Sequence, residues 1–302
     1  MKSELKQNAY AKLNLHLEVL NKRSDNYHNI ISFMTKVAYA DLLKLEEYTI
    51  FDSYSSDKVK VTITTIGGIY KESFSSINHK ENLIYKAVHS FCKFVNISGS
   101  FSFQIEKNIP FGAGLGGGSS NAAATLHLLN QVYGKISNTE LVEIGKSLGA
   151  DVPFCIIGEN SICQGIGEVV DNIEGTLDYR VLIINDGIHS DTAQAYRFLN
   201  RGPLCDIDAE HKAEELKKFF LDENKQLFFS ACKNDFEEPV FINYPELVQI
   251  KQELYNRGAD FVQMTGSGSS IFGLFKDPIV ANNAYLDLKE QYKLVMLSDF
   301  AY

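Results

Sequence analysis

The segment Pro110–Ser120 constrains the fold more than any other part of this chain, because it places five glycines within seven positions, directly before an alanine-rich amphipathic stretch. Glycine loses much backbone entropy on folding, so such a cluster indicates a loop that needs positive φ or a close approach of a ligand to the backbone. A helix starting near Asn121 would point N–H groups and the positive end of its dipole at one place, which favours a phosphate. We therefore predict an anion-binding loop; a flexible surface loop is the alternative.

Two common nucleotide-binding loops do not match this segment. Ser119 stands where a Walker A loop has its lysine, and the glycines do not form Gly-x-Gly-x-x-Gly after a buried parallel strand. If a nucleotide binds here, another architecture holds it.

Hydrophobic periodicity predicts the elements of the first half. Residues 11–19 alternate strictly, as in a half-buried strand whose polar face carries Lys12, Asn14 and His16. Taken alone, this face is expected to be exposed. Further strand-like runs indicate a mostly antiparallel sheet, and helical spacing indicates three helices, the third with capping-box spacing at Ser137 and Glu140; the strands are 31–38, 42–46, 59–63 and 101–105, and the helices 83–91, 122–133 and 137–148.

The pattern begins again past about residue 160. A strand is predicted at 181–184 and another at the end of the glycine-interrupted run 263–275, with helices at 192–199, 209–220 and 245–256 between them. Strands followed by helices in both halves predict an α+β protein of two layers. The length of 302 residues fits two domains, which we place at 1–161 and 162–302.

Composition excludes some classes of function. A net charge of -9 with no Lys/Arg-dense block argues against nucleic acid as a partner. Five cysteines without a Cys-x-x-Cys pair indicate reduced, buried thiols rather than a disulfide framework. We find no apolar signal core and no stretch approaching a membrane span, so we expect a cytoplasmic protein without a membrane partner.

Three further sites are candidates for chemistry. Asp151 follows a predicted helix and precedes an extended stretch fixed by Pro153, which would hold the carboxylate rigidly; by itself it reads as a turn aspartate. Lys12 on a rigid strand could neutralise a transferring phosphoryl group, and Asp151 could accept or orient a hydroxyl proton. The small, hydroxyl-rich segment 264–270 could bind a second anion or form only a tight turn.

In order along the chain, residues 11–15, 25–28, 114–123 and 148–154 resemble the motifs of the GHMP small-molecule kinases. The Asp25–His28 element and the triple glycine resemble the branch that acts on a cytidine-diphosphate-linked methylerythritol. The likeness covers nearly the whole chain, including 234–237 and 265–268.

The resemblance implies a two-domain GHMP kinase fold, with an N-terminal ribosomal-protein-S5-domain-2-like domain and a C-terminal ferredoxin-like α/β layer. It also implies transfer of phosphate from ATP, with Mg²⁺, to the substrate 2-hydroxyl in the non-mevalonate route to isoprenoid precursors. No protein metal ligands are assigned, and we expect a monomer or weak homodimer. The alternatives are a GHMP kinase for galactose, homoserine or mevalonate, and an inactive sensor of ATP and a sugar.

The resemblance also implies roles for particular residues. Lys12 and Asp151 would be the catalytic pair. Tyr27 would stack on the cytosine ring, His28 would bond its edge and Tyr196 would cover the other face. ATP would be bound by Pro110, Phe111, Gly112, Ala113, Gly114, Leu115, Gly116, Gly117, Gly118, Ser119 and Ser120, with Lys107 and Asn82 near the adenosine; the remaining substrate contacts would come from Asn14, Thr192, Gly266 and Ser267.

This sequence departs from the family pattern in three places. Asn26 stands where glycine is frequent, and Tyr196 where phenylalanine is more frequent. The segment 201–225 is longer and more charged than the family pattern leads us to expect, and the sequence suggests no function for it.

Overall fold

The computed structural model describes residues 5–199 and 209–302, and its contacts divide them into two compact units. The first, called unit 1, comprises the described parts of Met1–Ala11, Tyr39–Pro110 and Gly116–Ile157. Unit 2 comprises Lys12–Ala38, Phe111–Leu115 and the described parts of Gly158–Tyr302. Because each unit is assembled from separate segments, the single boundary expected at residue 161 stays a prediction.

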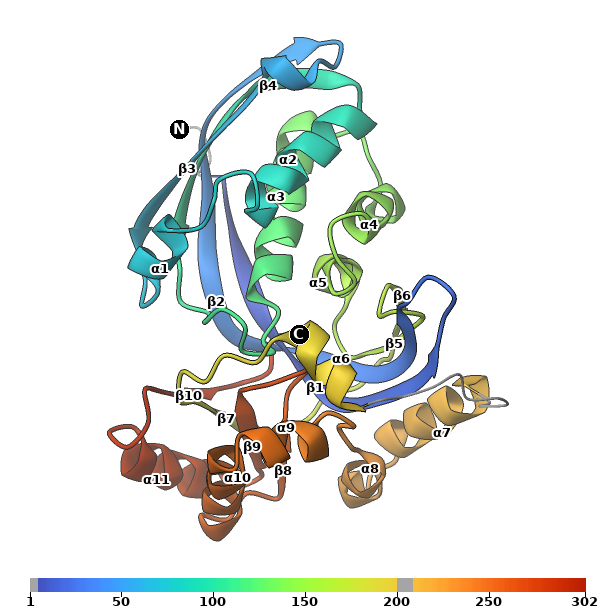
Figure 1. Ribbon diagram of the computed structural model, residues 1–302, viewed down its shortest axis with the longest axis vertical. Coiled ribbons are helices and arrows are strands. Elements are labelled where there is room, and N and C mark those ends of the chain that lie inside the picture. The colour runs from blue at the N-terminus through green and yellow to red at the C-terminus, as the bar shows by residue number, and fades with distance from the viewer. Residues whose placement is uncertain (1–4, 200–208) are drawn as a thin grey trace. The chain divides into compact units, whose positions relative to one another are not determined.

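Unit 1 is a sheet with helices (Figure 1). Its strands follow the order β3-β4-β2, with β2 antiparallel and β3 parallel to β4. The elements are the N-terminal end of β1 (Lys6–Lys22), most of β2 (His28–Asp52), η1 (Ser56–Lys58), β3 (Val59–Gly67), α1 (Lys71–Ser75), α2 (Leu83–Phe94), β4 (Ile97–Glu106), α3 (Gly117–Tyr133), α4 (Asn138–Lys146) and α5 (Val152–Ile157). The expected runs 31–38 and 42–46 belong to one strand, β2, that enters both units.

Local sequence sets the ends of the helices in unit 1. The predicted capping box is confirmed, because the Ser137 hydroxyl accepts from the Glu140 N–H and the Glu140 carboxylate accepts from the Ser137 N–H. Gly134 ends α3 with a φ of 69°, a left-handed conformation that glycine adopts without strain. These signals lie within a few residues of the backbone groups they satisfy, so the sequence alone reveals them.

Unit 2 contains a second sheet with the strand order β10-β7-β9-β8, all antiparallel. The first part of β2 pairs there with β5, and β5 with β6. The elements are β5 (Ser161–Gln164), β6 (Val169–Asn172), β7 (Arg180–Asn185), α6 (Thr192–Leu199), α7 (Ala209–Leu221), α8 (Lys225–Ala231), α9 (Glu237–Asn243), α10 (Glu246–Asn256), β8 (Phe261–Met264), β9 (Ile271–Phe275), α11 (Pro278–Leu288) and β10 (Leu294–Ser298).

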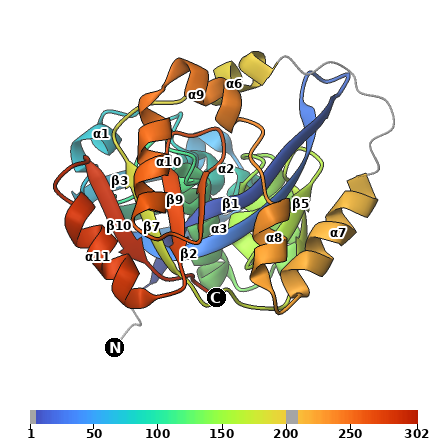
Figure 2. The ribbon, with the colours of Figure 1, turned by 90° about the horizontal axis from the view of Figure 1, so that it is seen from below.

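The core of unit 2 joins this sheet to two helices that lie over it (Figure 2). Leu254 of α10 and Ala284 of α11 are buried in one cluster with Ile184 of β7, Met264 of β8 and Phe275 of β9. The predicted α+β class is confirmed. Sequence reasoning missed β5, β6, β8, β10, α8 and α9, whose runs are too brief to show a clear period, and it also missed the longer helix α11.

Candidate functional site

The polar face of β1 is buried rather than exposed, so the expectation of an exposed face was wrong. Lys12 is 4% exposed, Asn14 0% and His16 6%. Segments more than two hundred residues away cover the strand: the Asn14 N–H donates to Thr265 Oγ1 at 3.0 Å, and Gln263 Nε2 donates to the Leu15 carbonyl at 3.0 Å. Alternation of polar and apolar residues cannot reveal that segments so distant in the chain bury the polar face of the strand.

Lys12 is held in a defined position inside unit 2. Its Nζ donates to Asn14 Oδ1 at 2.5 Å, and its backbone N–H donates to the Leu115 carbonyl at 3.0 Å. A Cβ built on Gly266 would lie 3.3 Å from the Lys12 ammonium, so the amine rests against the backbone of the predicted second loop. The structure therefore brings together Lys12, Asn14 and Gly266, which were predicted to share a site.

The glycine segment has the predicted backbone. Gly112, Gly114 and Gly116 have φ values of 58°, 75° and 67°, which disfavour other residues. A Cβ on Gly114 would lie 2.0 Å from the Thr265 carbonyl oxygen, and one on Gly112 would lie 2.2 Å from the His189 ring. Close packing between protein segments therefore requires two of these glycines, whether or not a ligand binds.

Helix α3 begins at Gly117, not near Asn121 as expected, so Gly117–Ser120 form its first turn. The N-cap Gly116 supplies no side-chain acceptor, and a helix leaves its first N–H groups without intrahelical partners. The Ser120 hydroxyl donates to the Tyr10 carbonyl at 2.6 Å, which anchors this turn to β1 within unit 1. A helix start of this kind can bind a phosphate.

Asp151 lies directly before α5, and Val152–Ile157 is helical, so the extended stretch expected after Asp151 was wrong. Pro153 sits in the first turn of this helix, where a missing N–H costs nothing. The Asp151 carbonyl accepts from the Cys155 N–H at 3.1 Å. A Cβ on Gly149 would lie 4.0 Å from Ser119 Oγ, so this turn adjoins the start of α3 within unit 1.

Lys107 and Asn82, expected near the adenosine, both have structural partners in unit 1. Lys107 is 1% exposed and forms an ion pair with the buried carboxylate of Asp41. Burial lowers the pKa of Lys107, and the Asp41 carboxylate opposes that change. Asn82 caps α2 by accepting from the Ile84 N–H at 2.9 Å. Their contact with adenosine stays a prediction.

Sequence reasoning missed Asp41, which joins the two ends of the glycine segment. Its carboxylate accepts from the N–H groups of Asn108 and Ile109 at 2.6 and 2.8 Å, and from Asn121 Nδ2 at 2.8 Å. Together with Lys107 it forms a network in which one side chain fixes both the entry to the segment and the first turns of α3. An isolated aspartate within a long strand carries no local signal for such a role.

Two of the residues expected to hold a pyrimidine, His28 and Tyr196, are in contact within unit 2. His28 stacks on Tyr196 with ring centroids 5.0 Å apart, and Tyr196 packs edge-on against Phe236 at 4.8 Å. The Tyr27 side chain is 59% exposed. Asn26 before it has a φ of 70°, a left-handed conformation that asparagine tolerates better than most residues with a Cβ.

Thr192 and Ser267 are also brought together. Their hydroxyl oxygens lie 2.9 Å apart, and the Ser190 hydroxyl donates to the Ser267 carbonyl at 2.6 Å. Four of the predicted substrate residues thus lie on segments of unit 2 that are hydrogen-bonded to one another: Asn14, Thr192, Gly266 and Ser267.

The described part of segment 201–225 has a structural role. Ala213, Leu216 and Phe220 of α7 are buried, and Lys212 pairs with Glu18 of β1 at 2.6 Å. Burial acts to raise the pKa of Glu18, but bonds from Lys212 and Lys233 hold it below its usual value.

Among the described residues, no group of three or more His, Cys, Asp or Glu side chains gathers as a metal site. Over the same ranges no helix is long and apolar enough to cross a membrane. Cys92, Cys155 and Cys163 are buried thiols and Cys232 is a half-buried one, none of them in a disulfide, whereas Cys205 lies outside the described residues.

Comparison with known proteins places this geometry in a family. The GHMP kinases N terminal domain matches residues 82–159, and the GHMP kinases C terminal domain matches residues 213–294. The 4-diphosphocytidyl-2-C-methyl-D-erythritol kinase of Clostridium novyi is 31% identical over 96% of this chain and 98% of its own length. The protein of the same name from Azobacteroides pseudotrichonymphae is 36% identical over 89% of this chain and 92% of its own length.

Solved structures agree on the fold. A crystal structure of 4-(cytidine 5'-diphospho)-2C-methyl-D-erythritol kinase is 28% identical, with a TM-score of 0.72 over 98% of this chain and 99% of that one. Homoserine kinase from Cytophaga hutchinsonii has the same TM-score of 0.72 at 18% identity, covering 99% of this chain and 96% of its own. The predicted two-domain GHMP kinase fold is confirmed, and since both structures fit equally well, backbone likeness does not separate the substrates.

Proposed function

Because this chain belongs to the 4-diphosphocytidyl-2-C-methyl-D-erythritol kinases of the GHMP superfamily, we propose how its residues transfer the γ-phosphate of ATP to the 2-hydroxyl of that substrate. The reaction yields the 2-phosphate and ADP, in the non-mevalonate route to isoprenoid precursors. The observation that carries this function is identity of 31–36% over most of the chain.

We assign the ATP polyphosphate to Pro110–Ser120. The positive φ values at Gly112, Gly114 and Gly116 and the uncapped start of α3 support this assignment. Backbone N–H groups at a helix start bind a phosphate through hydrogen bonds and through the helix dipole together. Bound ATP would therefore need no Walker lysine.

Mg²⁺ fits this arrangement as a companion of the nucleotide. The described residues form no three-ligand metal cluster, and Mg²⁺ in kinases is commonly held by few protein groups together with phosphate oxygens and water. When bound, the ion supplies neutralisation of the phosphate charges. The protein's own contribution is then to position ATP and the hydroxyl.

We assign Lys12 to stabilisation of the transferring phosphoryl group. Its ammonium is nearly buried and held by Asn14, so it needs little reorganisation to meet charge developing on the equatorial oxygens. A preorganised cation of this kind acts more strongly in a dry site than in water.

We assign Asp151 to the acceptor hydroxyl, which it orients or deprotonates. Its turn adjoins the start of α3, the proposed phosphate site, within unit 1. In a loose transition state the hydroxyl can keep its proton until late, so orientation contributes even without early deprotonation. Asp151→Asn is expected to lower kcat by about 100-fold or more; near-full turnover would remove Asp151 from the mechanism.

The substrate's base is assigned to the aromatic residues of unit 2. Tyr27 would stack on cytosine, His28 would bond its edge, and Tyr196 would supply the second ring face. The exposed Tyr27 ring and the proximity of His28 to Tyr196 support a shared site, and the two stacked rings would have to part to admit the base. Galactose, homoserine and mevalonate offer no base for these residues. We place the reaction in the cytoplasm, where ATP and reduced thiols are available.

A substrate panel tests the function. Purified protein is given ATP, Mg²⁺ and either the cytidine-linked substrate, galactose, homoserine or mevalonate, and ADP release and product phosphate are measured. We expect turnover with the cytidine-linked substrate alone. Turnover with only one of the other three would replace the assigned acceptor, and ATP binding without turnover on any of them would favour an inactive sensor.

A further inference from the structure

The segment Asn234–Glu237 has no role in the reaction described above, yet it makes a dense set of polar contacts in unit 2. Asn234 is 5% exposed, and its Nδ2 donates to the carbonyls of Met264 and Gly266 at 2.7 and 2.8 Å. Its Oδ1 accepts from the Phe236 N–H at 3.0 Å. One side chain therefore satisfies two carbonyls of the loop that begins after β8.

The same segment also holds β1. The Leu17 N–H donates to the Lys233 carbonyl at 2.7 Å, and the Asp235 N–H donates back to the Leu17 carbonyl at 2.9 Å. Asp235 Oδ2 accepts from the Val19 N–H at 2.9 Å. The strand that carries Lys12 and the loop that carries Gly266 are thus fixed to one short piece of chain.

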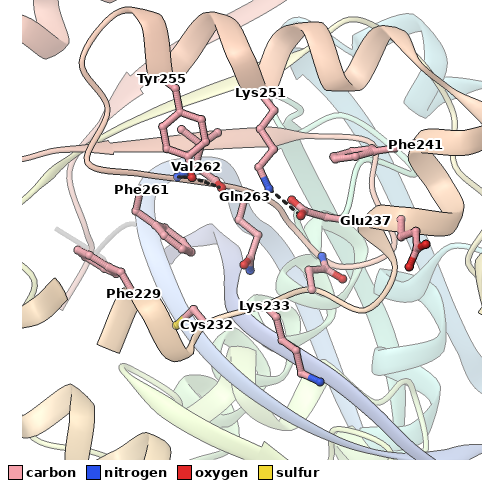
Figure 3. Close-up of a pocket in the computed structure, with 12 residues that line it drawn as sticks. Phe229, Cys232, Lys233, Glu237, Phe241, Lys251, Tyr255, Phe261, Val262 and Gln263 are labelled. Carbon is pink, nitrogen blue, oxygen red and sulfur yellow. Dashed lines mark hydrogen bonds and ion pairs between the residues drawn. The ribbon is translucent and has the colours of Figure 1, made fainter. Parts of the chain in front are cut away.

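Glu237 adds a third contact to the loop. Its Oε1 accepts from the Met264 N–H at 2.8 Å, while its Oε2 pairs with Lys251 of α10 at 2.7 Å (Figure 3). Glu237, Asn234 and Gln263 line one side of an open cavity of about 540 Å³. On this side Asn234 and Glu237 hold the loop backbone by hydrogen bonds, while the Met264 side chain packs in the apolar core.

We propose that Asn234 and Glu237 are positioning residues that set the path of loop 264–270 against β1, and thereby the place of the Lys12 ammonium. The loop reaches Lys12 by two short routes. The Lys12 amine lies beside Gly266, and it donates to Asn14, whose own N–H donates to Thr265 of the loop. This inference rests on the proposed function only where it predicts turnover. The conformational part stands independently.

The first test replaces Asn234 with Asp. The aspartate keeps the oxygen that accepts from the Phe236 N–H, but it replaces the Nδ2 donor by an oxygen that repels the Met264 and Gly266 carbonyls. Hydrogen–deuterium exchange, read by mass spectrometry on peptides covering 264–270, should be at least about 10-fold faster than in the wild type. Turnover with the cytidine-linked substrate, counted per folded molecule, should fall about 100-fold, since a shift near 1 Å is enough for that loss.

Asn130→Asp is the matched control. Asn130 makes the same type of clamp in unit 1, where its Nδ2 donates to the Ile136 carbonyl at 2.9 Å and its Oδ1 accepts from the Ile136 N–H at 3.3 Å. We expect this variant to lose stability without faster exchange in 264–270 and without loss of kcat per folded molecule. An equal loss of kcat in both variants would reduce the role of Asn234 to stability and overturn the proposal.

A second pair of variants covers the case in which Asn234→Asp does not fold. Glu237→Gln keeps an oxygen for the Met264 N–H and loses only the charge, so exchange in 264–270 should stay near the wild-type rate; Glu237→Ala should accelerate it. Unchanged exchange in Glu237→Ala would refute the clamp. If the wild type phosphorylates none of the acceptors, the proposed function fails, and the exchange data still decide whether the clamp exists.

Discussion

Gly114→Ala tests whether the close approach between the glycine segment and Thr265 matters for catalysis. An ideal Cβ at Gly114 would lie 2.0 Å from the Thr265 carbonyl oxygen, and Cβ atoms essentially never approach closer than 3.0 Å, so the two backbones must part by about 1 Å. The contact is between backbone atoms, which leaves no flexible side chain to yield. The φ of 75° adds strain for any residue with a Cβ.

Gly114→Ala is expected to lower both the free energy of unfolding and kcat/KM. The left-handed φ should lower the free energy of unfolding by about 1–2 kcal/mol, and the forced separation of the two backbones should lower it by about 1–3 kcal/mol more. The separation also moves Gly266 and the Lys12 ammonium that rests against it, so kcat/KM should fall about 100-fold. Urea unfolding followed by circular dichroism gives the first quantity, and a coupled assay of ADP release gives the second.

Gly134→Ala separates these contributions. Gly134 has a φ of 69° but nothing within 4 Å of an added Cβ, so it carries the same strain without the collision. We expect the cost of strain alone and unchanged kcat/KM. If Gly114→Ala matches Gly134→Ala in both stability and kcat/KM, the reasoning from close approach is refuted.

Three further predictions concern stability. Burial lowers the pKa of His16 from 6.5 to about 4, so between these pH values the folded state binds fewer protons than the unfolded state. As the pH falls from 6.5 to 4, the free energy of unfolding of the wild type should therefore drop by about 3 kcal/mol relative to that of His16→Gln. Parallel pH profiles of urea unfolding for the two proteins would contradict this. Asn26→Ala should cost about 1 kcal/mol while Asn26→Gly costs nothing, because only alanine is strained at a φ of 70°; equal midpoints would show that the turn relaxes. Asp41→Asn should lower the free energy of unfolding by about 3–5 kcal/mol, because it removes the charge that compensates the buried Lys107 ammonium. The double variant Asp41→Asn/Lys107→Met should regain most of this stability. If it does not, the hydrogen bonds of Asp41 to the loop backbone, rather than its charge, account for the loss.

Local signals predicted several features correctly. The capping box at Ser137 and Glu140, the helix stop at Gly134 and the positive φ values of the glycine segment each depend on backbone groups within a few residues. The motifs in order also identified the family. Where a residue bonds or shapes the backbone close to it in the chain, the adjacent sequence indicates why that residue type is present.

Features decided at long range escaped such signals. Lys12 stands on a strand that reads as half-exposed, yet residues 263–266 cover it, and Asp41 joins groups at positions 107–109 and 121 that no periodicity connects. The glycine cluster was explained by positive φ or by a ligand near the backbone, whereas at Gly114 the Thr265 carbonyl alone already excludes a side chain. The sequence by itself determined which backbone conformations and residue types are available here; only the tertiary structure decided which polar groups are removed from water and what they meet there, because burial and close contact depend on segments that folding brings together from opposite ends of the chain.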